Sequence, residues 1–289
     1  MSPAAWAVRT PRDVVRVGGP DATTYLQGQL SQDLAALRSG GSAWTLALEP
    51  RGRVASWFRI TASGDAWLCD LDAGHADALV ERLTRFRLRV AVDIDTVTGW
   101  QMIAVRGPGA AGVTGRDAPI AAEVTWPGFE GIDLVGPAPT CDAVEVDPVW
   151  LERARVAAAF PRLGAEITPD TIPAEAGVVA ASVSFTKGCY VGQELVARID
   201  SRGGQVPRPV RLLVADAPVD PASPVTDADG ELGVVTSAVA ASDHRGRPVG
   251  LALAPLARRV GPGAAVEVAG VAARVVEPPF AITGPAVSA

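Results

Sequence analysis

Residues 42–62, SAWTLALEPRGRVASWFRITA, carry the pattern that decides the fold of this chain. Trp44, Leu46 and Leu48 alternate with small or polar residues, which is the two-residue period of a β-strand with one buried face. A Pro-Arg-Gly turn follows, and the run after the turn again has the residue types of a strand. The stretch therefore predicts an antiparallel hairpin.

The hairpin lies inside a first unit that we place at residues 1–100. Five flanking segments have strand or helix patterns: a strand at 13–17, a helix capped by Asp21, a strand at 66–71, a helix at 75–88 and a strand at 89–95. This order is typical of a split β-α-β layer. We expect an antiparallel sheet with helices on one side.

A second unit is predicted for residues 101–206. Its expected segments are a strand near 100–107, a helix after Pro108 and Gly109, strand-like runs near 123–128 and 130–136, and a helix at 149–160 begun by Asp147 and Pro148. Residues 162–177 are rich in Pro and Gly. Loops of that length in compact proteins are usually functional or disordered, so we expect an ordered loop or the lining of a cleft.

A third unit is predicted for residues 207–289, because paired glycines and two prolines mark a change of domain just before it. Its strand-like runs are short and separated by turns: 210–215, 233–239, 248–254, 264–270 and 272–277. This pattern predicts a small antiparallel β-barrel. The whole chain is therefore expected to have an α+β fold.

Composition narrows the classes of function. The three cysteines are odd in number and far apart, which suits a reducing compartment better than a disulfide framework. Charged residues come too early for a secretory leader, and no run of about 20 apolar residues could span a membrane. We expect a cytoplasmic protein. The net charge of -6 argues against general electrostatic binding of nucleic acid.

One local basic group is the exception. Arg82, Arg85 and Arg89 are spaced to share one face of the helix predicted at 75–88. The face is more simply explained as solvated than as an RNA contact. Direct nucleic-acid binding is therefore not expected, although an RNA-contacting module remains a third hypothesis.

Several chemistries lack the residues they need. His75 and His244 are far apart and no Cys-x-x-Cys pair occurs, so no metal site is predicted. Neither histidine lies in a motif that would serve a Ser or Cys nucleophile. The sequence also contains neither a Walker loop nor a G-x-G-x-x-G after a strand.

The segment around Cys189 is different. Lys187 precedes this cysteine by two residues, Gly188 and Gly192 bracket it, and a strand-like run follows. A nearby cation and free backbone N–H groups favour a thiolate, and glycines permit unusual backbone angles. The alternative is a small hydrophobic residue in a turn, and local composition leaves the two open. Cys69 and Cys141 lack these features and are interpreted as structural.

Glu175 is the second candidate. A carboxylate in a Pro-containing loop can bind an amidine-like edge, such as the N–C–N edge of a pterin, through two charge-assisted hydrogen bonds. The alternative is a solvated loop acid.

The segments that contain Cys189 and Glu175 both resemble segments of one known family. The run KGCYVGQE, residues 187–194, resembles the signature of the folate-binding YgfZ family, which is related to the glycine-cleavage T-protein. The opening run at 17–34, PRGRV at 50–54 and the segment 153–175 are similar to the same family in the same order. The resemblance covers nearly the whole chain and is weakest at about 100–145.

The resemblance implies a ring of three domains that binds tetrahydrofolate near its middle. It matches Glu175 to the acid that holds the pterin and Cys189 to the cysteine of the signature. The rest of the motif is Lys187, Gly188, Tyr190, Gly192, Gln193 and Glu194. We take Cys189 and Lys187 as the reactive pair, and Tyr190, Gln193 and Glu194 with Glu175 as folate-binding residues near the thiol.

The function that the resemblance implies is support of iron–sulfur cluster assembly or repair, including enzymes that thiolate tRNA. Iron–sulfur proteins are then the expected clients. One motif cysteine cannot supply the four ligands of a cluster, so a contact would be transient, shared between chains or replaced by thiol–disulfide exchange. The sequence leaves these three open.

One departure from the T-protein bears on the alternative, a tetrahydrofolate-dependent aminomethyl or one-carbon transferase. The T-protein carries an aspartate where this chain has Ala55, Ser56 and Trp57. A neutral hydroxyl or indole cannot replace an ionised carboxylate in proton transfer or charge stabilisation. The transferase hypothesis would recover if another carboxylate, such as Asp70 or Asp72, pointed into the folate pocket.

Overall fold

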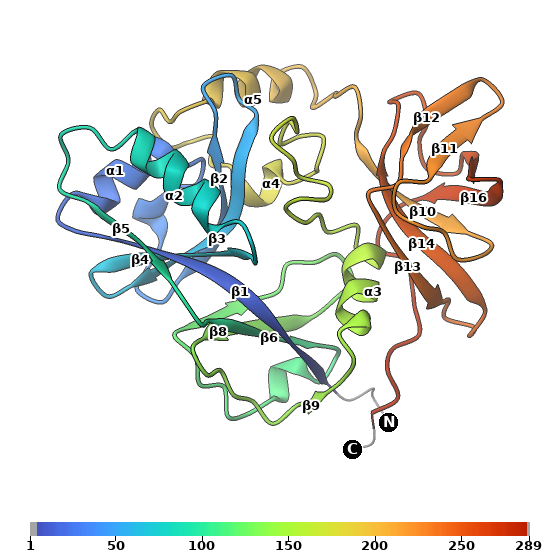
Figure 1. Cartoon of the computed structure of the whole chain (residues 1–289), viewed down its shortest axis with the longest axis horizontal. Helices are drawn as coiled ribbons and strands as arrows, with labels where there is room; N and C mark the ends of the chain where they lie inside the picture. The colour runs from blue at the N-terminus through green and yellow to red at the C-terminus, as the bar shows by residue number, and fades with distance from the viewer. Residues whose placement is uncertain (1–4, 288–289) are drawn as a thin grey trace.

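Two curled antiparallel sheets form the frame of the protein. The computed structural model describes residues 5–287. A nine-stranded sheet is built from the first half of the chain and a seven-stranded sheet from the last third, with few helices (Figure 1). The predicted α+β class and the C-terminal antiparallel barrel are confirmed.

The first sheet has the strand order β2-β3-β4-β1-β6-β8-β7, with β5 and β9 paired to β1 off this path. Its strands are β1 (Trp6–Gly18), β2 (Ser42–Leu48), β3 (Val54–Ser63), β4 (Ala66–Asp72), β5 (Asp93–Val97), β6 (Gln101–Arg106), β7 (Ile120–Glu123), β8 (Gly131–Gly136) and β9 (Val144–Glu145). β2 and β3 pair as the predicted hairpin.

The long strand β1 joins the two halves of this sheet. Its C-terminal part pairs with β4 and β5, and its N-terminal part pairs with β6 and β9. The 13–17 strand predicted from the sequence is only one end of it. The predicted first and second units therefore share one sheet, and the boundaries at 100 and 206 stay a prediction.

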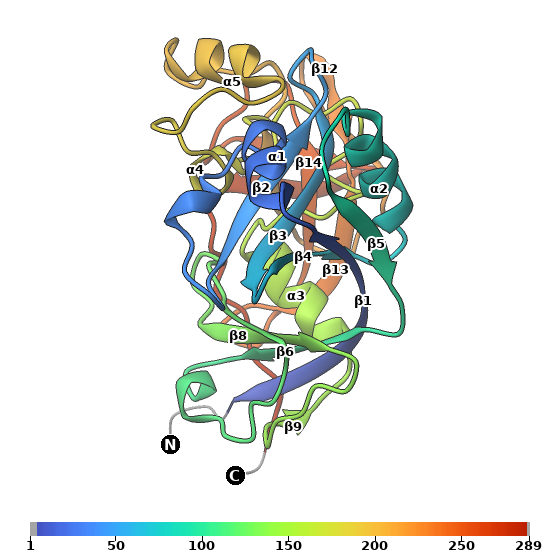
Figure 2. The same ribbon diagram turned by 90° about the vertical axis from the view of Figure 1, so that its left-hand side faces the viewer.

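Helices α1 (Ala22–Gln29) and α2 (Ala76–Arg85) pack beside the β2–β3–β4 end of the sheet (Figure 2). The largest core cluster lies here and includes Leu26, Leu46, Phe58, Ile60 and Leu79, all fully buried. Asp21 does not cap α1 with its side chain, because its carboxylate accepts a hydrogen bond from Ala91 N.

The second sheet has the strand order β12-β11-β15-β16-β10-β14-β13. Its strands are β10 (Val210–Ala215), β11 (Pro224–Asp227), β12 (Gly230–Val234), β13 (Ser237–Ser242), β14 (Pro248–Pro255), β15 (Ala265–Val268) and β16 (Val271–Val276). An isolated bridge from Gly233 to Leu256 joins β12 to the end of β14, so the sheet curls toward closure. The run predicted at 233–239 is divided between two strands.

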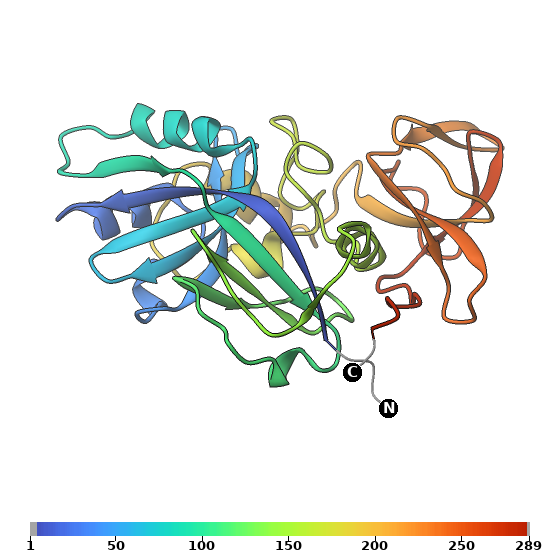
Figure 3. The ribbon, with the colours of Figure 1, turned by 60° about the horizontal axis from the view of Figure 1, so that its bottom comes forward.

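Helix α3 (Val149–Ala157) lies between the two sheets, and Figure 3 shows it end-on there. Ala154 packs against the first sheet, whereas Val156 and Ala157 join the core cluster of the barrel. Asp147 accepts a hydrogen bond from Val149 N at 2.8 Å, as its predicted role at the start of this helix requires. The helix therefore fixes the barrel against the first sheet.

Three predicted segments are wrong. The helix after Pro108 and Gly109 is a single 3-10 turn at Ala110–Gly112, and the strand near 123–128 falls earlier, at Ile120–Glu123. The strand-like run after Gly192 is helix α5 (Gln193–Asp200), which follows the short helix α4 (Val179–Ser182). Val196 and Ile199 are three residues apart on one helical face, which a short apolar run does not distinguish from a strand.

Candidate functional site

A cavity of about 660 Å³ opens where β1, β4 and β6 meet α3 and the chain at 160–163. Residues from nine separate parts of the sequence line it, so its composition could not be read from any one motif. Pockets that hold small organic ligands have volumes of roughly 300–1,000 Å³. The cavity is therefore large enough for a cofactor-sized molecule.

One wall of the cavity is aromatic. Trp44 and Trp57 stack with ring centroids 4.3 Å apart, and Phe160 contacts both rings at 5.4 and 5.2 Å. Trp126 completes the group at 4.9 Å from Phe160. Flat, polarisable faces of this kind favour a planar ring system.

Beside this aromatic wall, arginine and aspartate side chains form a series of alternating positive and negative charges. Arg12 and Arg59 both donate to buried Asp70, and Arg59 also donates to Asp133 at 3.0 Å. Arg106 donates to the other oxygen of Asp133 at 2.8 Å. The charges of Arg106 and Arg59 keep the pKa of Asp133 low although its burial acts in the opposite direction. Asp133 is therefore ionised at neutral pH.

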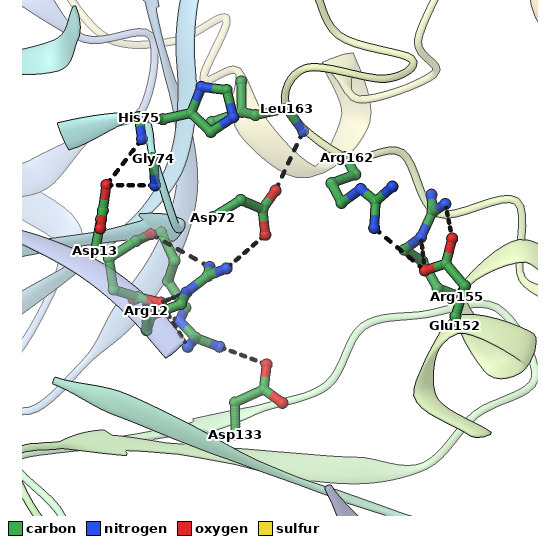
Figure 4. Close-up of polar contacts among 12 residues, drawn as sticks. Arg12, Asp13, Asp72, Gly74, His75, Asp133, Glu152, Arg155, Arg162 and Leu163 are labelled. Carbon is green, nitrogen blue, oxygen red and sulfur yellow. Dashed lines mark hydrogen bonds and ion pairs between the residues drawn. The ribbon is translucent and has the colours of Figure 1, made fainter. Parts of the chain in front are cut away.

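Asp72 is at the other end of this series and, like Asp133, lines the cavity. One of its oxygens accepts a hydrogen bond from Arg12 at 2.7 Å and the other accepts from Leu163 N at 3.1 Å (Figure 4). Its side chain is 32% exposed. Asp70, by contrast, is completely buried and does not line the cavity. The acid that the transferase hypothesis needs thus has a candidate in Asp72, but one whose two oxygens are already engaged.

Glu152, Arg155 and Arg162 form the opposite wall (Figure 4). Arg155 donates to both oxygens of Glu152, at 2.8 and 2.6 Å. Burial disfavours the charge of Glu152, but hydrogen bonds from Arg155 and the charges of Arg155 and Arg162 outweigh it and lower the pKa. Arg155 also binds fully buried Glu166 at 3.0 Å, which in turn accepts from Ser237 in β13. This wall is therefore fixed to the barrel.

Ala55, Ser56 and Trp57, which the resemblance aligns with the T-protein aspartate, have uncharged side chains. Ser56 is buried, and among residues 5–287 its hydroxyl has no hydrogen-bond partner. Trp57 lines the cavity with its ring and donates from Nε1 to Ser182 Oγ at 2.9 Å. The segment that the resemblance aligns with the T-protein aspartate therefore contributes an indole to the cavity wall.

Cys189 lies outside this cavity on an exposed turn. Lys187 Nζ donates to the carbonyl oxygens of Gln27, Leu30 and Gln32 at 2.7, 2.7 and 2.9 Å. An ammonium group has three donors, so all of them are used at the C-terminal end of α1. These contacts fit an anchoring role for Lys187, and its part in the reactivity of Cys189 stays a prediction.

Tyr190 anchors the other side of the turn. Its ring belongs to the largest core cluster, and burial raises its pKa to about 12. Its backbone N–H donates to Gln193 Oε1 at 3.2 Å. Cys189 is therefore presented to solvent between two anchored neighbours, whereas Cys69 is buried as predicted for a structural residue.

The two glycines that bracket Cys189 differ. Gly192 has a φ of +83°, and a Cβ there would lie 2.6 Å from Glu49 O. Gly52, at the turn of the β2–β3 hairpin, has a φ of +78° and would bring a Cβ within 3.1 Å of Gly192 O. The PRGRV and KGCYVGQE segments therefore pack backbone to backbone. Gly188 has open space around it, so it does not share this requirement.

Cys189 has a smaller cavity of its own, of about 400 Å³. Tyr190, Gln193 and Glu194 line it, and it shares no lining residue with the central cavity. Phe185, a 52% exposed aromatic side chain, also lines it. The predicted folate-binding residues of the motif are thus grouped around the thiol, and their contact with folate stays a prediction.

Glu175 lies in the loop predicted at 162–177, which contains no strand and no helix among the described residues. One oxygen of its carboxylate accepts from Ile172 N at 3.3 Å, and its backbone carbonyl accepts from Val210 N at 2.8 Å. The residue does not line the central cavity. Phe160, Arg162 and Leu163, at the start of the same loop region, do line it.

The arginine face predicted on the helix at 75–88 does not exist. α2 ends at Arg85, and Arg89 lies beyond it with a φ of 57°. Arg82 is buried and donates to Leu48 O at 3.0 Å. Of the three arginines only Arg85 is on the exposed face of the helix, where it pairs with Glu49 and Glu81.

No protein-family model matches the chain. Sequence comparison finds an uncharacterized protein of Haemophilus influenzae, 28% identical over 67% of this chain and 68% of that protein. A mitochondrial iron-sulfur cluster assembly factor IBA57 homolog of Chaetomium globosum is 27% identical over 70% of this chain and 54% of its own length. The tRNA-modifying protein YgfZ of Vibrio vulnificus is 26% identical over 74% of this chain and 70% of its own.

This chain is a homologue of the YgfZ and IBA57 proteins. The match spans a little more than half of the length of the IBA57 homologues, 54% and 57% for two of them. The glycine cleavage system aminomethyltransferase T from Bartonella henselae has the same fold, with a TM-score of 0.77, 21% identity and coverage of 96% of this chain and 87% of that one. The predicted relationship to the YgfZ family and the T-protein fold is confirmed.

Proposed function

We propose that this protein is a folate-binding accessory factor for the assembly or repair of iron–sulfur clusters, with Cys189 as its functional thiol. Its clients would be iron–sulfur proteins, including enzymes that thiolate tRNA. The roles for which the IBA57 and YgfZ homologues are named, iron-sulfur cluster assembly and tRNA modification, support this proposal. The observation that carries the proposal is the exposed Cys189, held between the saturated ammonium of Lys187 and the buried ring of Tyr190.

A thiolate suits iron–sulfur chemistry because it is a soft ligand and a good nucleophile. Within residues 5–287 no group of three Cys, His, Asp or Glu side chains could hold a metal ion. The proposed thiol therefore acts with ligands from another molecule or by exchange with a disulfide. The three free cysteines are compatible with a reducing cytoplasm, which we propose as its location. No described helix is long and apolar enough to cross a membrane.

The central cavity is our proposed site for tetrahydrofolate. Its aromatic wall fits the flat pterin and benzoyl rings, and its carboxylates and guanidiniums fit the polar edges of the pterin. Bound there, tetrahydrofolate would supply a one-carbon carrier. The family resemblance assigns the pterin edge to Glu175, which does not line this cavity; the two placements of the pterin are alternatives, and the affinity of Glu175→Ala distinguishes them.

The transferase alternative has one observation in its favour, the carboxylate of Asp72 at the cavity surface. An acid acting as a base needs a free oxygen near the substrate. Asp72 instead gives one oxygen to Arg12 and the other to Leu163 N. If the protein were such a transferase, Asp72→Asn would abolish turnover of an aminomethyl donor with tetrahydrofolate; the accessory role predicts that neither wild type nor variant turns over.

The proposal is tested by complementation of cells that lack this protein, with the activity of an iron–sulfur enzyme as the readout. Cys189→Ala is expected to fail to restore that activity, and the matched control Cys141→Ala is expected to restore it. Rescue by Cys189→Ala at the wild-type level would exclude a functional role for the Cys189 thiol.

The pterin assignment is tested separately by ligand binding. Glu175→Ala should bind tetrahydrofolate about tenfold more weakly than wild type, as expected for loss of a charge-assisted pair. Unchanged affinity would exclude Glu175.

A further inference from the structure

Arg106 is a completely buried arginine whose hydrogen bonding is incomplete. Nη1 donates to Asp133 at 2.8 Å and to Val105 O at 2.9 Å. Nε and Nη2 have no partner anywhere in the described part of the chain. Buried donors are nearly always satisfied in native proteins, and an unpaired one calls for an explanation such as a ligand or water.

The two unpartnered nitrogens are a matched pair. Nε and Nη2 lie along one edge of the guanidinium plane and present two parallel N–H groups. This edge has the geometry that binds both oxygens of a carboxylate. A lysine or a single amide would leave one donor, whereas Arg106 leaves a complete bidentate edge.

The charges around Arg106 also favour an anion. From Asp72 the series alternates through Arg12, Asp70, Arg59 and Asp133, and it ends on a cation. At this end two guanidiniums share the single carboxylate of Asp133. A further carboxylate beside Arg106 would continue the alternation.

Trp126 contacts Arg106 and also lines the central cavity. The guanidinium carbon of Arg106 lies 4.2 Å from the centroid of the indole ring. Trp126 itself lines the cavity and contacts Phe160 there. It belongs to the loop between β7 and β8 rather than to a strand. Arg106 does not itself line the cavity, so we infer that a ligand there would reach the guanidinium by displacing Trp126.

We propose that Arg106 receives a carboxylate of the cavity ligand, and that Trp126 covers Arg106 until the ligand takes its place. This inference rests on the proposed function, because the carboxylate we assign is that of the glutamate tail of tetrahydrofolate. The pterin end then lies toward the Trp44 and Trp57 wall. Arg106 and Trp126 thus select folates over pterins without a tail.

The experiment compares two ligands by calorimetry: tetrahydrofolate, and 6-methyltetrahydropterin, which has the pterin ring but no glutamate. Arg106→Lys keeps a positive charge beside Asp133 but has no bidentate edge. It should bind tetrahydrofolate about tenfold or more weakly, as expected for loss of a bidentate pair, and 6-methyltetrahydropterin within about twofold of wild type. Arg153→Lys is the matched control, because Arg153 also lies over an indole, Trp150 at 4.4 Å, but does not line the cavity.

Trp126→Ala provides a test that leaves the buried arginine in place. Without the indole, the ratio of tetrahydrofolate to 6-methyltetrahydropterin affinity should rise above that of wild type. Equal losses for both ligands in Arg106→Lys, or no loss for either, would overturn the proposal, as would an unchanged ratio in Trp126→Ala. If wild type bound neither ligand, the proposed folate site itself would be wrong, and the inference would fail with it.

Discussion

The central cavity and the Cys189 turn are built in opposite ways. The cavity is assembled from distant segments, and its charges are paired with one another in a buried series. The Cys189 turn is one contiguous motif, anchored at Lys187, Tyr190 and Gly192, with the thiol exposed. The comparison indicates two separate sites: the central cavity, which we propose for folate, and an exposed thiol that does not line it.

The largest expected effect is a loss of stability from disrupting the buried charges beside the cavity, with the Cys189 turn left intact. Arg59→Met removes the cation that joins Asp70 to Asp133, both of which are buried. Breaking a buried ion pair from one side costs about 3–5 kcal/mol, so we expect the free energy of unfolding to fall by that amount. Urea denaturation measures it. Arg85→Met, which removes an exposed pair, is the control and should cost less than about 1 kcal/mol.

A change in Arg59→Met no greater than in Arg85→Met would show that the series does not support the cavity. The thiol of Cys189 should react with a thiol reagent at the wild-type rate in the folded variant, because the two sites share no lining residue.

The second largest effect is a loss of stability from disrupting the Cys189 turn, with the central cavity left intact. Gly192→Ala places a Cβ 2.6 Å from Glu49 O at a positive φ, so we expect a loss of about 2–3 kcal/mol. Gly188→Ala is the matched control, since no atom lies within 4 Å of a Cβ at that position. It should change stability by less than about 0.5 kcal/mol. Similar losses in both variants would contradict the packing of the two turns.

A pH dependence sharpens the role of Lys187. Burial lowers its pKa from 10.5 to about 8. Between these values the unfolded chain binds a proton that the folded chain does not, so the unfolding free energy should rise with pH from about 8 to about 10.5. Lys187→Met should remove this rise, which we expect to be about 1–2 kcal/mol after allowing for partial exposure.

The measurement is chemical denaturation of wild type and Lys187→Met at several pH values. Above pH 10 the raised pKa of Tyr190, about 12, acts in the opposite direction in both proteins, because the folded chain then holds the extra proton. The difference between the two proteins isolates Lys187. A difference that falls with pH from 8 to 10 would contradict the account.

The smallest effect on stability is expected at Cys189 itself. Its side chain is exposed, so Cys189→Ser should change the unfolding free energy by less than about 0.5 kcal/mol. Cys69→Ser, at a completely buried cysteine, should cost more than 1 kcal/mol or so because a hydroxyl replaces a thiol in the core. Thermal unfolding of both variants makes the comparison, and an equal loss would mean that Cys189 is a packing residue.

The sequence predicted the turn better than the cavity, for a physical reason. Gly52, Gly192 and Cys189 could be singled out because each lies in a short contiguous motif, although Gly52 and Gly192 come together only in the folded chain. Trp126 and Phe160 become part of one wall only through the packing of a loop and α3 on the sheet. The spacing of residues in the sequence does not indicate which distant side chains will pack against each other.

Some errors have the same origin. The spacing of Arg82 and Arg85 placed both on a solvated helical face, but the carbonyl of Leu48 in another element accepts hydrogen bonds from Arg82 and buries it. The hairpin at 42–62 was predicted correctly because its alternation and its turn agree with each other. A local sequence pattern thus predicts structure reliably where the tertiary contacts agree with it.

The most direct test of two separate sites is the affinity of Cys189→Ala for tetrahydrofolate, measured by calorimetry beside wild type and Trp57→Ala. We predict that Cys189→Ala binds within about twofold of wild type, whereas Trp57→Ala loses about tenfold with its part of the aromatic wall. A loss in Cys189→Ala as large as that in Trp57→Ala would place the thiol in the folate site and contradict the account.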